Sequence, residues 1–239
     1  MTLDELVTQL RAAYASHLTA VVLYGSAASG EHIPKKSDFN VLVLLDHIDD
    51  RTLVAASAVA RAWADAGNPP PMTMTTTEWR RSSDVFPMEY ADILDRHRVL
   101  FGAPPFDGMV IAPADLRLQL EQQALGKLLQ LRQGMLLAGT DRKRQLDLLE
   151  NSFSTIMVLV RAALRLAGRT PAADNAGNAA QLGEVAGFDA APFARISRHV
   201  RNEARIPADD VPAIATSYLS AVGRLDAWLD TFTAQEGIS

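Results

Sequence analysis

The stretch VLYGSAASGEHIPKKSDFNVLVLL, residues 22–45, decides the fold. It ends one apolar run, residues 18–24, and begins another, residues 39–45. Both runs are rich in aliphatic residues and too continuously apolar for a strand with one wet face. We therefore predict two strands that are buried on both faces.

The polar residues between these runs suggest a chemistry. Gly25 and Ser26 follow the first run, and a glycine lets backbone N–H groups come close to a phosphate because it carries no side chain. Asp38 and Asn40 are two residues apart at the start of the second strand, so their side chains share one face. Lys36 and Ser37 are further candidates for phosphate contact, with a solvated loop as the alternative for the lysine. A metal-dependent nucleotidyl transfer site needs two carboxylates here, and this stretch supplies one.

The first half alternates helix and strand signals. Thr2 and Glu5 predict a capping box before a helix that ends near Tyr14. Further signals predict a helix from Asp49 or Asp50 to about residue 66, a weaker strand, a helix and a short strand. The last three cover residues 72–75, 86–95 and 98–101.

The second half shows only helix signals. A Gly/Pro-rich stretch at 102–108 is the best linker, so we expect domains at 1–106 and 107–239. Beyond it we predict a polar loop at 169–178 and helices at 113–138, 141–167, 191–204 and 212–233. The expected fold class is α+β: a small mixed-sheet domain followed by an all-α helical bundle.

The composition excludes several classes of protein. The 48% hydrophobic content supports a core, and the net charge of −5 disfavours nucleic acid as a partner. The absence of cysteine rules out disulfides and fits a cytoplasmic location. No apolar run approaches the roughly 18 residues of a membrane span, and the acidic N-terminus does not resemble a signal peptide. The bias towards Ala, Arg and Leu suggests a bacterial protein with a GC-rich genome.

The motif Tyr24-Gly25-Ser26, eleven residues, Asp38-Phe39-Asn40-Val41 resembles that of the nucleotidyltransferase superfamily, which has a polymerase-β-like fold. The helical second half resembles the bundle of kanamycin-type and other aminoglycoside nucleotidyltransferases. The resemblance implies a nucleoside triphosphate such as ATP, with Mg²⁺, and transfer of a nucleotidyl group to a hydroxyl. The acceptor would be a small molecule such as an aminoglycoside, received by the helical domain, or a protein.

The resemblance also implies roles for single residues. Gly25, Ser26, Lys36 and Ser37 would contact the nucleotide. Asp38 would be catalytic and a metal ligand, and Asn40 would be a metal ligand through its amide oxygen. The family pattern has an acid where Asn40 stands, so the motif here is a degenerate DxN.

The family's third carboxylate is absent from the predicted strand at 71–75. Two acids further along the chain could substitute, Asp84 and Glu89. We favour Glu89 as the catalytic carboxylate and general base, because it follows a Phe-Pro turn that could aim it inward.

Other readings remain open at this level. The chain could be a catalytically degenerate nucleotide-binding or protein-interaction module, as Asn40 and the acid-free third strand suggest, or a toxin-like or antitoxin-like protein. Its leucine-rich helices, 116–137 and 146–166, are predicted core with an option for a homodimer seam through the helical domain. Four arginines at helical spacing predict a basic helix face, either solvated or phosphate-binding: Arg195, Arg198, Arg201 and Arg205.

Overall fold

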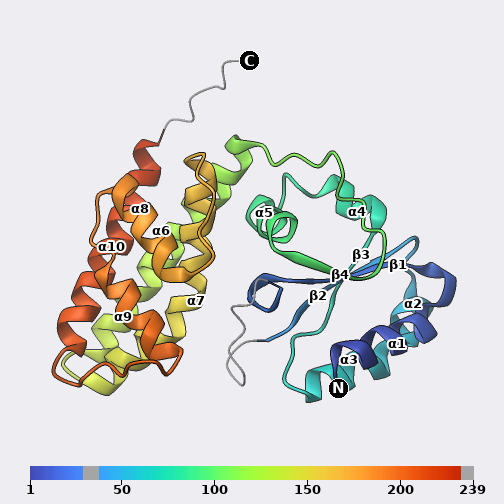
Figure 1. Cartoon of the computed structure of the whole chain (residues 1–239), viewed down its shortest axis with the longest axis horizontal. Coiled ribbons are helices and arrows are strands. Elements are labelled where there is room, and N and C mark those ends of the chain that lie inside the picture. The colour runs from blue at the N-terminus through green and yellow to red at the C-terminus, as the bar shows by residue number, and fades with distance from the viewer. Residues whose placement is uncertain (29–37, 233–239) are drawn as a thin grey trace. The chain divides into compact units, whose positions relative to one another are not determined.

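The computed structural model describes residues 1–28 and 38–232 of the chain. The chain divides into two units, Met1–Ile111 and Ala112–Ser239 (Figure 1). Phe106, Met109 and Ile111 pack against a core of the first unit. Lys36 and Ser37 lie outside the described residues, so the roles expected of them stay predictions.

A four-stranded mixed sheet organises the first unit, in the order β3-β2-β1-β4. The strands are β1 (Leu18–Tyr24), β2 (Asn40–Leu45), β3 (Met72–Thr75) and β4 (His97–Gly102). β1 runs antiparallel to both β2 and β4, whereas β2 and β3 are parallel. The carboxyl end of β1 therefore meets the amino ends of β2 and β4. All four strands were predicted from the sequence and are confirmed, as is the burial of the two central ones.

Helices cover both faces of this sheet (Figure 1). One face packs against α1 (Leu3–Tyr14) and α3 (Ser57–Asp65), with Trp63 fully buried. The other packs against α4 (Thr76–Arg81) and α5 (Pro87–Asp95). Alternate residues of β1 and β2 serve the two cores, as expected for strands buried on both faces.

Capping decides where several of these helices begin. The predicted capping box of α1 is present: the Thr2 N–H donates to Glu5 Oε2 at 2.8 Å, and the Glu5 N–H to Thr2 Oγ1 at 3.2 Å. A similar box between Thr75 and Glu78 starts α4, which the sequence reading missed. The single helix expected up to residue 66 is two, because α2 (Asp50–Ala55) ends at Ala56 before α3 begins.

In its described part the second unit is all helical, as predicted. Its helices are α6 (Pro113–Ala138), α7 (Arg142–Leu166), α8 (Asn175–Ala186), α9 (Ala191–Val200) and α10 (Val211–Thr231). α6 packs on α7 and α10, and α8 and α9 complete the bundle. No helix in the described residues is both long enough and apolar enough to cross a membrane.

Two predictions for this unit were wrong. α8 begins inside the expected loop at 169–178, because the Asp174 side chain accepts the Gly177 N–H and caps it. The predicted four-arginine helix face does not form, because α9 ends at Val200. Arg201, at the helix end, donates to Glu203, and Arg195 forms an ion pair with Asp210.

Candidate functional site

Three strand ends converge around Tyr24. Its neighbours across the sheet are Asn40 on β2 and His97 on β4. Gly25 follows with φ = +77°, a conformation open to glycine at little cost, and begins a short 3₁₀ helix over Gly25–Ala27. The Gly25 N–H donates to the carbonyl of Arg96, the residue before β4, at 3.3 Å, so this group is already hydrogen-bonded.

The two halves of the sequence motif lie side by side. A Cβ placed on Gly25 would stand 3.4 Å from Asn40 Nδ2, so the amide of Asn40 rests against the turn. Phe39 faces the other way: its ring lies 6.2 Å from that of Trp63, and its N–H donates to Asn68 Oδ1 at 3.1 Å. Strand alternation places Asn40 on the face of the sheet that α4 and α5 cover. Asp38, just before the strand, is exposed.

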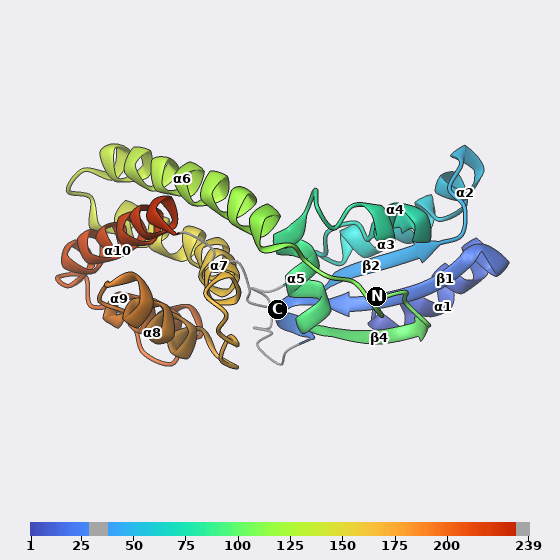
Figure 2. The same ribbon diagram turned by 90° about the horizontal axis from the view of Figure 1, so that it is seen from above.

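The negative charges of two carboxylates of α5 act on the end of β1. Burial raises the pKa of Tyr24, and the negative charges of Glu89 and Asp92 raise it further. The ring of Tyr24 itself packs against the core beneath α5. The charge of Glu89 thus acts on the carboxyl end of β1, where α5 lies close to the sheet (Figure 2).

Asp92 is the residue that sequence reasoning missed. Its side chain is buried, at 9% exposure, whereas Glu89 is exposed. The three-residue spacing of Glu89 and Asp92 could have indicated it, because residues three apart on a helix are neighbours on its surface. α5 begins with Pro87 in its first turn and carries Glu89 and Asp92 on successive turns. Both side chains have polar or charged contacts, so neither is an idle acid.

Packing holds α5 in place over the sheet. His97 donates from Nδ1 to the Ile93 carbonyl at 2.9 Å, which ties the end of α5 to the start of β4. Tyr90 stacks on Trp79 with ring centroids 4.0 Å apart, and its hydroxyl donates to the Trp79 carbonyl at 2.8 Å. Burial raises the pKa of Tyr90 to about 12. The acids of α5 therefore stand on a rigid support.

The described residues do not form a ready metal cage. No group of three or more His, Asp or Glu among them is placed to hold a metal ion. The oxygen donors that the motif and α5 supply are the Asp38 carboxylate, the Asn40 amide and the acids of α5. This set suits Mg²⁺ that arrives bound to substrate phosphates, because Mg²⁺ is commonly held by one or two carboxylates plus phosphate. It does not suit a resident structural ion.

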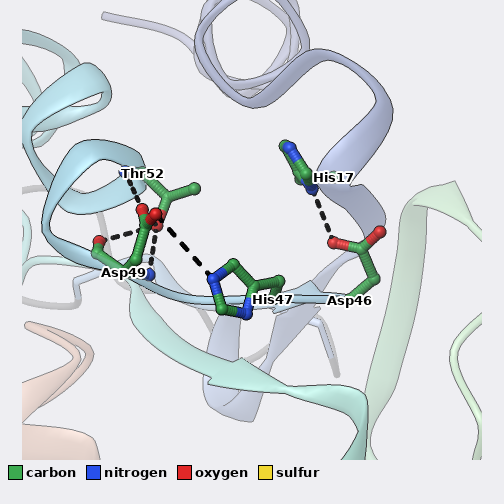
Figure 3. Close-up of polar contacts among 5 residues, drawn as sticks. All are labelled: His17, Asp46, His47, Asp49 and Thr52. Carbon is green, nitrogen blue, oxygen red and sulfur yellow. Dashed lines mark hydrogen bonds and ion pairs between the residues drawn. The ribbon is translucent and has the colours of Figure 1, made fainter.

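A second polar cluster lies at the opposite end of β1 and β2 (Figure 3). His17 and Asp46 approach to 2.9 Å between Nδ1 and Oδ1, and His47 lies 3.8 Å from Asp49. Asp49 also accepts the Thr52 N–H and caps α2. These contacts are exposed: the first joins the residues beside the ends of β1 and β2, and the second lies at the start of α2. We therefore assign the cluster to structure.

Comparison with known proteins supports the fold. No family model matches the sequence, and a comparison with curated proteins gives no match. Among solved structures, the chain resembles the spectinomycin adenyltransferase AAD(9) from Enterococcus faecialis, crystallised with ATP and spectinomycin. The two share 12% identity with a TM-score of 0.58, over 96% of this chain and 100% of that one. Such a likeness shows the fold alone, a mixed-sheet domain followed by a helical domain, and confirms the α+β fold class predicted from the sequence.

Proposed function

We propose that the chain binds a nucleoside triphosphate at the Gly25–Ala27 turn and transfers its nucleotidyl group to a hydroxyl of an acceptor. One observation carries this proposal. The turn, the amide of Asn40 and the acids of α5 gather at one end of β1, in a fold shared with an adenyltransferase.

The proposed site residues have different roles. The backbone N–H groups of Ser26 and Ala27 in the turn would receive the phosphates, with Lys36 and Ser37 as further contacts. Asp38 and Asn40 would hold the Mg²⁺ of the nucleotide, which neutralises phosphate charge. Asn40 brings no charge of its own, so the acids of α5 would supply the negative potential that a second strand carboxylate gives elsewhere.

The transfer itself needs one proton acceptor. The acceptor hydroxyl oxygen attacks the α-phosphorus, a new P–O ester bond forms, and the bond to the β-phosphate oxygen breaks to release pyrophosphate. Glu89 is the proposed general base that takes the hydroxyl proton. It is exposed, as a base that meets a substrate must be, while buried Asp92 would keep the site negative.

The binding step is tested by calorimetric titration with ATP in the presence and absence of Mg²⁺. We expect Mg²⁺-dependent binding that Asp38→Asn weakens at least tenfold, or about 1.4 kcal/mol. Asp65→Asn is the matched control, because Asp65 is an exposed acid at the end of α3. Unchanged binding by the Asp38 variant would remove that residue from the site.

The transfer step is tested with α-labelled ATP and a panel of aminoglycosides, including spectinomycin, and candidate proteins. We expect labelled product with the native chain and loss of product, but not of ATP binding, with Glu89→Gln. Binding without any transfer would favour the alternative function, a nucleotide-binding module in which Asn40 marks lost catalysis.

A further inference from the structure

Helix α6 is apolar on two opposite faces. One face is buried against α7 and α10 and carries five core residues, Leu116, Leu120, Ala124, Leu128 and Leu131. The other face carries four exposed leucines, which we call the leucine stripe. Leu118, Leu125, Leu129 and Leu136 are 69%, 46%, 47% and 83% exposed. Figure 2 shows α6 along one side of the helical unit, with α7 and α10 together on its other side.

The stripe is a single seam along the helix. Its leucines are spaced by seven, four and seven residues, so they stay within one narrow sector of an α-helix. Gln122 and Arg132 fill the two gaps, and together the six positions follow the alternating four- and three-residue spacing of a coiled-coil seam. The seam covers eighteen steps of the helix, about 27 Å. Contiguous exposed apolar surface of this kind marks an interaction site.

The spacing of the leucines also indicates which partner the stripe can bind. The seam reads the same in both directions about residue 127, because Leu118 mirrors Leu136 and Leu125 mirrors Leu129. A two-fold axis there would set each leucine of one copy against a leucine of the other. This is the self-complementarity that an isologous contact requires, in which residue i meets j and j meets i.

The polar positions agree with an antiparallel arrangement. The same axis sets Gln122 opposite Arg132 of the second copy, where an amide oxygen can accept from the guanidinium. A parallel pairing in register would instead set Arg132 against Arg132, and like charges in contact repel.

We propose that α6 pairs with α6 of a second copy of this chain, antiparallel, about a two-fold axis at residue 127. A single helix pair of this length buries roughly 1,000 Å² or less in total, at the small end of specific interfaces. The dimer should therefore be reversible, with a dissociation constant on the order of micromolar or weaker. This inference is independent of the proposed nucleotide site.

Sedimentation velocity of the full chain, from low micromolar to several hundred micromolar, tests the association. We expect a shift from monomer to dimer with rising concentration, and its loss in the double variant Leu125→Glu, Leu129→Glu. Leu and Glu have similar helix propensities, so the helix should survive, and circular dichroism checks this. Leu137→Glu is the matched control: Leu137 is 78% exposed but lies off the stripe, so this variant should still dimerise.

Cysteine cross-linking tests the geometry, because the chain has no cysteine of its own. In the proposed dimer, Gln122→Cys in one copy faces Arg132→Cys in the other, while identical positions lie roughly 15 Å apart along the axis. Mixing the two variants should give a disulfide-linked dimer under oxidation, and neither alone should. A monomer at every concentration overturns the proposal, whether the first unit or a different protein then covers the stripe. Self-cross-linking of each variant alone would also overturn it.

Discussion

Substitution of Gly25 by alanine tests separately how the turn affects the stability of the fold and how it affects nucleotide binding. Gly25 has φ = +77°, a region that costs an L-residue with a Cβ roughly 1–2 kcal/mol. The new Cβ would stand 3.4 Å from Asn40 Nδ2, which is close to ordinary contact, so crowding adds little to this strain. We therefore expect Gly25→Ala to lower the free energy of unfolding by about 1–2 kcal/mol without preventing folding.

Gly67→Ala is the matched control for this experiment. Gly67 has φ = +88°, and a Cβ there would meet nothing within 4 Å. It should lose a similar amount of stability, because the backbone strain is the same. It lies in the turn after α3, on the face of the sheet opposite to the one that α5 covers. The substitution leaves in place the Asn68 side chain that accepts the Phe39 N–H, so we expect nucleotide binding to be unchanged.

Urea unfolding followed by tryptophan fluorescence measures the stability of both variants. Trp63 and Trp79 are fully buried in the first unit, so they report on its unfolding. Titration with ATP and Mg²⁺ then measures binding, and we expect Gly25→Ala to bind at least tenfold more weakly than Gly67→Ala. A Gly25 variant as stable as the native chain would refute the backbone argument. Equal ATP affinities of the two variants would refute the placement of the site.

Two further predictions concern titration and buried polar contacts. Burial raises the pKa of every tyrosine, so the stability that the neutral tyrosines contribute should be fully present below their ordinary pKa of about 10 and be lost as the pH rises through the raised folded values. Tyrosinate absorbance of the folded chain should thus appear above pH 10, and half-titration of the four tyrosines at pH 10 without unfolding would contradict this. His199 accepts the Ile206 N–H at Nδ1 (3.0 Å) and donates from Nε2 to Glu150 (2.7 Å), at 11% side-chain exposure. His199→Ala should cost roughly 2–3 kcal/mol in urea unfolding, because it leaves two polar partners without a bond. Exposed His47→Ala should leave the urea midpoint unchanged, and equal midpoints for the two variants would show that the His199 contacts add nothing.

Local patterns made much of the fold predictable. The apolar runs at 18–24 and 39–45 can only be buried strands, since their side chains leave no wet face. Thr2 with Glu5 starts a helix through bonds within four residues, and Asp141 caps α7 in the same way. Asp174, which caps α8, lies inside a polar stretch. That stretch is typical of a loop, so the start of α8 was missed.

The sequence by itself determined the two strands and the Gly25-Ser26 turn, because these depend on spacing along a single segment. The sequence favoured Glu89 among the distant acids, but only the tertiary structure showed that the charge of Asp92 also acts on Tyr24. Glu89 and Asp92 lie some fifty residues from Asn40, and only the packing of α5 over β1 brings their charges to Tyr24. Sheet order and helix packing are set by burial summed over the whole core, and no local pattern encodes that sum.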